Sequence, residues 1–175
     1  MRMETILAPT IFSLFPPNIA MNSLLQTVQA LIRHHPQKVN LHVPTPSDLQ
    51  ALDDYSRQME AYLDVVGDLT KSLGKGVKRL RRRQRYFEAL IEESDANARQ
   101  FHQEGQEKLA RAAEARRQAA AEAARAYQAE ADSQNARLLE FMDAKLALEA
   151  RLTEVHRERA RLEARLARDA QWQPL

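Results

Sequence analysis

The chain has 175 residues, of which 44% are hydrophobic and 29% are charged, and its formal net charge is +2. Only 6% of the residues are aromatic and there are four glycines, a balance that favours long helices with exposed surfaces over a compact globular core. The chain has no cysteine, which excludes disulfide bonds, thiolate nucleophiles and cysteine-based metal centres. We therefore expect an all-α protein with an elongated shape.

Residues 1–45 are predicted to form an N-terminal arm with one short amphipathic helix, at residues 18–34. This helix must end before Pro36, because a proline disfavours helical backbone at the preceding residue. A segment of this length gains too little to fold in isolation. We expect the arm either to dock in a groove on another protein or to pack across the chain's own helices. Its candidate docking residues are Ile11, Phe12, Leu14, Phe15, Leu24, Leu25 and Val28.

A second helix is predicted to start at Pro46, within the sequence Thr45-Pro46-Ser47-Asp48. Thr45 provides an N-cap hydroxyl, and Pro46 lacks only an N–H that the first helical position cannot use. Asp48 can accept a hydrogen bond from the backbone of the cap residue, as in a capping box. The amphipathic helix that follows is expected to cover residues 46–73.

An apolar residue recurs at every seventh position of this region, which is typical of a helix that packs against another helix. These seam positions are Leu52, Met59, Val66, Leu73, Leu80, Phe87 and Phe101, with the polar Ser94 between the last two. The companion apolar residues lie three positions further on before Gly74 and four positions further on after Gly76. Such a shift marks a turn, a kink or a stutter, and two glycines cost a helix about 2 kcal/mol relative to alanine. We therefore predict that residues 74–76 break the helix, as either a hairpin turn or a kink.

Residues 77–171 are predicted to form one long coiled-coil helix, with a short tail at residues 172–175. At 1.5 Å per residue this helix would be about 140 Å long, so the chain cannot be globular. Its middle is rich in alanine, which has a high helix propensity but offers a thin packing surface. The seam thickens again at Phe141, Leu148, Val155 and Leu162. Lys145 and Arg159 stand on the companion line, where cations disfavour a plain homodimer or meet acidic residues of a partner.

A basic block at residues 75–85 contains seven cations and no acidic residue. Its cations are Lys75, Lys78, Arg79, Arg81, Arg82, Arg83 and Arg85. The segments on either side, residues 46–74 and 86–105, each have a net charge of −4. The block could pair with these acidic segments, which a hairpin turn at Gly74 would bring alongside it. It could instead bind nucleic-acid phosphates, or serve a membrane or targeting role.

No group of residues in the sequence has the pattern of an active site. The five histidines do not form a metal-ligand set on one helix face, and a long rod offers no pocket that would perturb two carboxylates for acid–base catalysis. We therefore predict a protein that is not an enzyme and that has no cofactor and no resident metal.

Our first hypothesis is a structural subunit that assembles into a larger homo- or hetero-oligomeric complex. Its protein partners would be held through the coiled-coil seam and the N-terminal arm. The alternatives are a nucleic-acid-associated coiled-coil protein that binds phosphates through the basic block, and a peripheral membrane scaffold. No apolar run approaches the roughly 18 residues needed to cross a bilayer. We therefore predict a soluble intracellular protein, in the cytoplasm or alternatively the nucleus.

Overall fold

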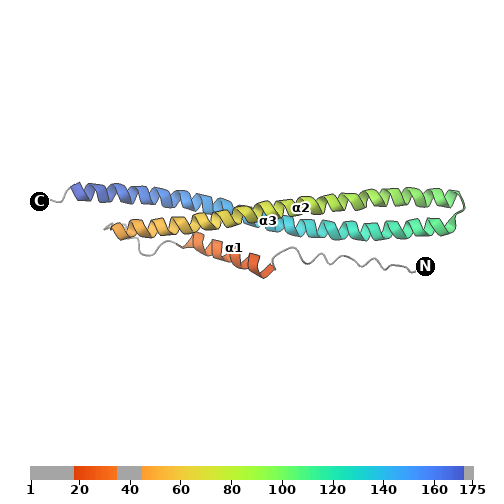
Figure 1. Ribbon diagram of the computed structural model, residues 1–175, viewed down its shortest axis with the longest axis horizontal. Coiled ribbons are helices and arrows are strands. Elements are labelled where there is room, and N and C mark those ends of the chain that lie inside the picture. The colour runs from red at the N-terminus through yellow and green to blue at the C-terminus, as the bar shows by residue number, and fades with distance from the viewer. Residues whose placement is uncertain (1–17, 35–44, 172–175) are drawn as a thin grey trace.

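The structure is a computed structural model that describes residues 18–34 and 45–171, and these residues form three α-helices. They are α1 (Asn18–Arg33), α2 (Pro46–Gln103) and α3 (Glu107–Gln171). Helices α2 and α3 run antiparallel as one long hairpin, and α1 lies along the half of the hairpin where α2 begins (Figure 1). The predicted all-α, elongated architecture is confirmed.

The start of α2 has the predicted capping arrangement. The backbone N–H of Thr45 donates a hydrogen bond to a carboxylate oxygen of Asp48 at 2.7 Å, and the Thr45 hydroxyl lies 2.6 Å from the same oxygen. Pro46 is the first residue of the helix. Local sequence therefore determines this boundary, because every contact that defines it is made within four residues.

The prediction of a break at residues 74–76 is wrong, because α2 continues through both glycines to Gln103. Gly76 is buried in the helix interface, and the hairpin partner α3 packs along the whole of this region (Figure 1). A helix whose face is covered along its length gains more from packing than the roughly 2 kcal/mol that two glycines cost. The predicted helices at residues 46–73 and 77–171 are therefore replaced by α2 and α3, with the turn between them at residues 104–106.

The turn is built around Gly105, which has a φ of +72°. The N–H of Gln106 donates to the carbonyl of Phe101 at 2.8 Å, and the N–H of Gly105 donates to the carbonyl of His102 at 3.2 Å. These two bonds form the Schellman arrangement, which satisfies carbonyls at a helix end and needs a residue in the left-handed region. Glycine takes that conformation without the steric cost that a Cβ atom imposes.

The large apolar side chains that are fully buried gather in one half of the molecule. We call this half the three-helix section, and it comprises α1, residues 46–73 and residues 138–166. The core there comprises Met21, Val28, Leu31, Leu52, Tyr55, Met59, Val66, Leu73, Phe141, Ala144, Leu148, Val155 and Leu162. All three helices contribute to this cluster, so α1 is an integral part of the core and not a separate element.

The remaining half, residues 74–137, is a hairpin of two helices that we call the distal hairpin. Its buried α3 residues are mainly alanines: Ala110, Ala113, Ala120, Ala124 and Ala131. On α2 they are opposed by small residues such as Ser94 and Ala98, and by Phe87, which stacks on Tyr127 with ring centroids 5.5 Å apart. Small side chains allow two helices to approach closely but bury little apolar surface.

Candidate interaction surfaces

The predicted seam residues pack the chain against itself. On α2, Leu52, Met59, Val66 and Leu73 are buried, and Leu80, Phe87 and Phe101 are half-buried. On α3, Phe141, Leu148, Val155 and Leu162 are buried. Because α2 and α3 of one chain cover each other along this line, a partner that binds the folded hairpin must use a different surface.

Ion pairs reinforce this internal contact where the sequence places cations beside the seam. Arg159 donates to Asp53 across the interface at 2.5 Å and to Glu163 on its own helix at 3.0 Å. The hydrogen bond that Arg159 donates to Asp53, together with the negative charge of Asp53, raises the pKa of Arg159 above its ordinary value. Lys145 lies 3.5 Å from Glu149. These two cations therefore meet acidic residues of the same chain.

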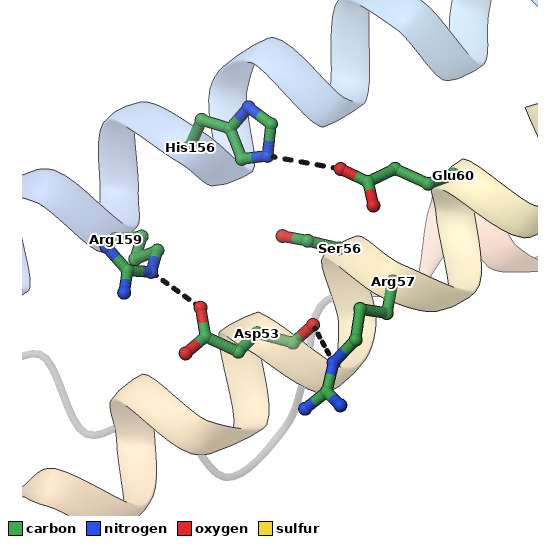
Figure 2. Close-up of a pocket in the computed structure, with 6 residues that line it drawn as sticks. All are labelled: Asp53, Ser56, Arg57, Glu60, His156 and Arg159. Carbon is green, nitrogen blue, oxygen red and sulfur yellow. Dashed lines mark hydrogen bonds and ion pairs between the residues drawn. The ribbon is translucent and has the colours of Figure 1, made fainter.

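A shallow, open cleft of about 480 Å³ lies between α2 and α3 beside Arg159. It is lined by Asp53, Ser56, Arg57, Glu60, His156 and Arg159 (Figure 2). His156 faces Glu60 at 3.9 Å, and Asp53 is held by Arg159. The Ser56 hydroxyl is buried without a hydrogen-bond partner among the described residues. A serine nucleophile needs a base within hydrogen-bond reach, and this cleft does not provide one to Ser56.

Tyr55 and Arg151 form a polar contact inside the three-helix section. The Tyr55 hydroxyl lies 2.5 Å from the carbonyl of Leu31 and 2.6 Å from the carbonyl of His34, and so caps the end of α1. Arg151 lies 2.8 Å from Glu154. Burial acts to lower the pKa of Arg151, but hydrogen bonds with Glu154 and Tyr55 outweigh it and the net direction is upward. The hydroxyl of Tyr55 therefore connects the end of α1 to the hairpin.

The residues of the predicted docking arm divide into two groups. Val28 is fully buried against the hairpin, and Leu24 and Leu25 are partly buried against the same core. The helical part of the arm thus packs on the chain's own helices, one of the two expected outcomes. Ile11, Phe12, Leu14 and Phe15 lie outside the described residues.

An apolar stripe that the sequence analysis did not predict lies on the face of α3 that is turned away from the seam. Its members are Leu139, Met142 and Leu146, whose side chains are 53%, 47% and 62% exposed. Their spacing of three and four residues places them on one helix face, on the far side of α3 from the buried line of Phe141 and Leu148. The sequence contains this spacing, but the buried apolar residues nearby make the exposed ones hard to recognise from sequence alone.

The basic block lies on α2 just beyond the three-helix section, and most of its side chains are exposed. Arg81 donates to Asp132 of α3 at 2.5 Å and to Gln84 at 2.9 Å. Among the residues that the structure describes, Asp132 is the one acidic residue within ion-pairing distance of the block. A hairpin turn at Gly74, one of the two alternatives for the predicted break, would have brought acidic residues alongside the block, but α2 continues through this position.

Comparison of the chain with protein-family models, with curated proteins and with solved structures finds no match. Within residues 18–34 and 45–171, no group of three or more histidine, aspartate or glutamate side chains could hold a metal ion. The same residues contain no helix that is long and apolar enough to span a membrane. Inference about function therefore rests on the geometry of the exposed surfaces.

Proposed function

We propose that the protein is a non-enzymatic structural subunit that assembles with other proteins, or with further copies of itself, through helix packing. The observation that supports this proposal is the exposed stripe of Leu139, Met142 and Leu146 on α3. Three large apolar side chains at this spacing form the half of a helix–helix contact that a second amphipathic helix completes.

The stripe is a better partner surface than the predicted seam, because the seam is already covered within the chain. Burying three exposed side chains of this size contributes about 1 to 2 kcal/mol each, since roughly half of each side chain is already covered. The rod also presents the stripe on a straight, stiff support, so little conformational freedom is lost when a partner helix binds.

A photo-crosslinking amino acid at Met142 tests this proposal in the native source. The matched control carries the same group at Leu109, which is 48% exposed at the far end of the hairpin and belongs to no stripe. We expect Met142 to crosslink to the apolar face of an amphipathic helix, identified by sequencing the crosslinked peptide. Light scattering of the purified chain then distinguishes a second copy from a different protein.

The variant L139Q/L146Q provides the second arm of the test, because glutamine removes the apolar contact and keeps helix propensity. We expect this variant to lose the Met142 crosslink and to fold normally by circular dichroism, whereas L109Q keeps the crosslink. A purified chain that stays monomeric, with no more crosslinking at Met142 than at Leu109, would contradict the proposal.

A further inference from the structure

The basic block is left without neutralising charge by the way the hairpin folds. Six of its seven cations, Lys75, Lys78, Arg79, Arg82, Arg83 and Arg85, have no ion pair among the described residues. Helix α2 presents these cations over about 15 Å of its length. Like charges held this close repel one another and lower stability unless a counter-charge is supplied from outside.

Several acidic residues on either side of the block pair with residues outside it. Upstream, Asp53 pairs with Arg159 at 2.5 Å. Downstream, Glu93 pairs with Arg116 at 3.5 Å, and Asp95 pairs with Arg99 on its own helix. Because the turn lies at Gly105 and not at Gly74, α3 provides cations to these acids and almost no acids to the block. Internal pairing therefore does not account for the block.

One face of the block ends in an exposed aromatic ring. Lys75, Arg79, Arg82 and Tyr86 follow one another at spacings of four, three and four residues, which aligns them along one side of the helix. Tyr86 is 58% exposed, and it contacts Phe87 edge-on with ring centroids 5.2 Å apart. Phe87 itself is stacked on Tyr127 in the interface. The Tyr86 ring is therefore anchored through Phe87 while much of its surface stays open.

We propose that this face binds single-stranded nucleic acid without sequence selectivity, with the cations on backbone phosphates and Tyr86 stacked against a base. Arginine and lysine contact phosphates regardless of sequence, and an exposed aromatic ring stacks on any base. A membrane surface fits less well, because the cationic face lacks the row of large apolar side chains that would insert beside lipid headgroups. A single-stranded partner fits because its bases are free to stack.

Fluorescence anisotropy of the full chain with a labelled oligothymidylate of about 20 nucleotides tests this inference. We expect saturable binding at about 0.05 M salt, and the logarithm of the binding constant should fall against the logarithm of salt with a slope of about −3, as expected when about four cations contact phosphates. The variant R79E/R82E should bind at least about tenfold more weakly. The control K108E/R111E makes the same change in net charge on exposed residues of α3 at the far end of the hairpin, and should bind within about twofold of the parent.

Two further measurements separate this ligand from other polyanions. Y86A should weaken binding of the oligonucleotide at least about fivefold, whereas binding carried by phosphates alone would leave it unchanged. Co-flotation with vesicles that contain phosphatidylserine tests the lipid alternative. Absence of saturable binding, equal losses in the two charge-reversal variants, or vesicle binding without oligonucleotide binding would each overturn the proposal.

Discussion

The three-helix section and the distal hairpin belong to the same pair of helices but are held together by different chemistry. In the three-helix section, leucine, valine, methionine, tyrosine and phenylalanine from three helices share one core. In the distal hairpin, alanines on α3 meet small residues on α2, and no third helix covers them among the described residues. Apolar burial per turn of helix is therefore much greater at one end than at the other.

This difference indicates a gradient of stability along the rod. A contact between two helices that is built from alanine gives little packing energy. The distal hairpin therefore depends more than the three-helix section on helix propensity and on cross-helix ion pairs. Local opening should accordingly begin at the end with the turn and stop at the three-helix section. The exposed stripe of Leu139, Met142 and Leu146 lies on α3 where the three-helix section begins, so the segment that carries this surface is well packed.

The replacement Leu148→Ala is expected to have the largest effect, because Leu148 is 1% exposed in the three-helix core. We expect the free energy of unfolding to fall by about 3 kcal/mol, from lost transfer energy and the cavity that remains. The matched change in the distal hairpin, Ile91→Ala, removes a half-buried side chain and should cost about 1 kcal/mol. Urea denaturation measures both, and equal losses would contradict the proposed gradient.

The replacement Tyr55→Phe tests how firmly α1 is attached to the three-helix section. The phenol hydroxyl forms hydrogen bonds with backbone carbonyls at the end of α1. Its removal should lower the free energy of unfolding by about 2 kcal/mol and increase hydrogen exchange across α1. Tyr62→Phe is the control, because Tyr62 is also partly buried against the core but its hydroxyl has no hydrogen bond among those described. If the free energy of unfolding fell equally in both variants, the hydroxyl of Tyr55 would not be what attaches α1 to the hairpin.

Two glycine substitutions test why the hairpin turns where it does. Gly105→Ala should lower the free energy of unfolding by about 1 to 2 kcal/mol, because alanine is strained at a φ of +72°. Gly74→Ala should raise it by about 1 kcal/mol, since helix propensity improves and the new Cβ would meet only Leu138 Cδ2, at 4.0 Å. Thermal unfolding measures both shifts, and a loss on Gly74→Ala would show that the helix needs a glycine there.

Gly74 and Gly105 show how far the sequence could predict the fold. The start of α2 was predicted correctly because its contacts are local to Thr45 and Asp48. The break predicted at residues 74–76 was wrong because Gly74 and Gly76 carried more weight in the prediction than the apolar seam around them. Gly74 follows the seam residue Leu73, whereas Gly105 is flanked only by the polar residues Glu104 and Gln106. Packing along the seam keeps Gly74 and Gly76 in the helix, whereas no apolar seam residue adjoins Gly105.

The interaction surfaces were harder to predict, since they depend on which helix faces remain uncovered. Leu139 and Leu138 are neighbours of the same type, yet Leu138 packs against the core and Leu139 is exposed. The basic block was evident from composition, but its lack of counter-charge follows from the hairpin register that pairs Arg81 with Asp132. Both properties arise from contacts far apart in the chain, which a seven-residue repeat does not specify.

The smallest predicted effect concerns pH and the turn of the distal hairpin. His102 on α2 lies 3.1 Å from Glu114 and 3.6 Å from Glu107, which are both on α3, across the turn. The hydrogen bond with Glu114 raises the pKa of His102 above its ordinary value of 6.5. The folded protein therefore binds this proton more tightly than the unfolded chain. The resulting stabilisation is complete below about pH 6 and is lost as the pH rises through the raised folded pKa.

Glu114→Gln separates this pair from the other carboxylates of the turn, because it removes the charge and keeps the side-chain length. An NMR titration should place the pKa of His102 above 6.5 in the parent chain and lower in the variant. The parent should also lose more thermal stability than the variant between about pH 6 and pH 8, and high salt should reduce the difference because the pair is exposed. A His102 pKa at or below 6.5 in the parent would show that protonation does not stabilise the turn, which would leave the Gly105 backbone as its main determinant.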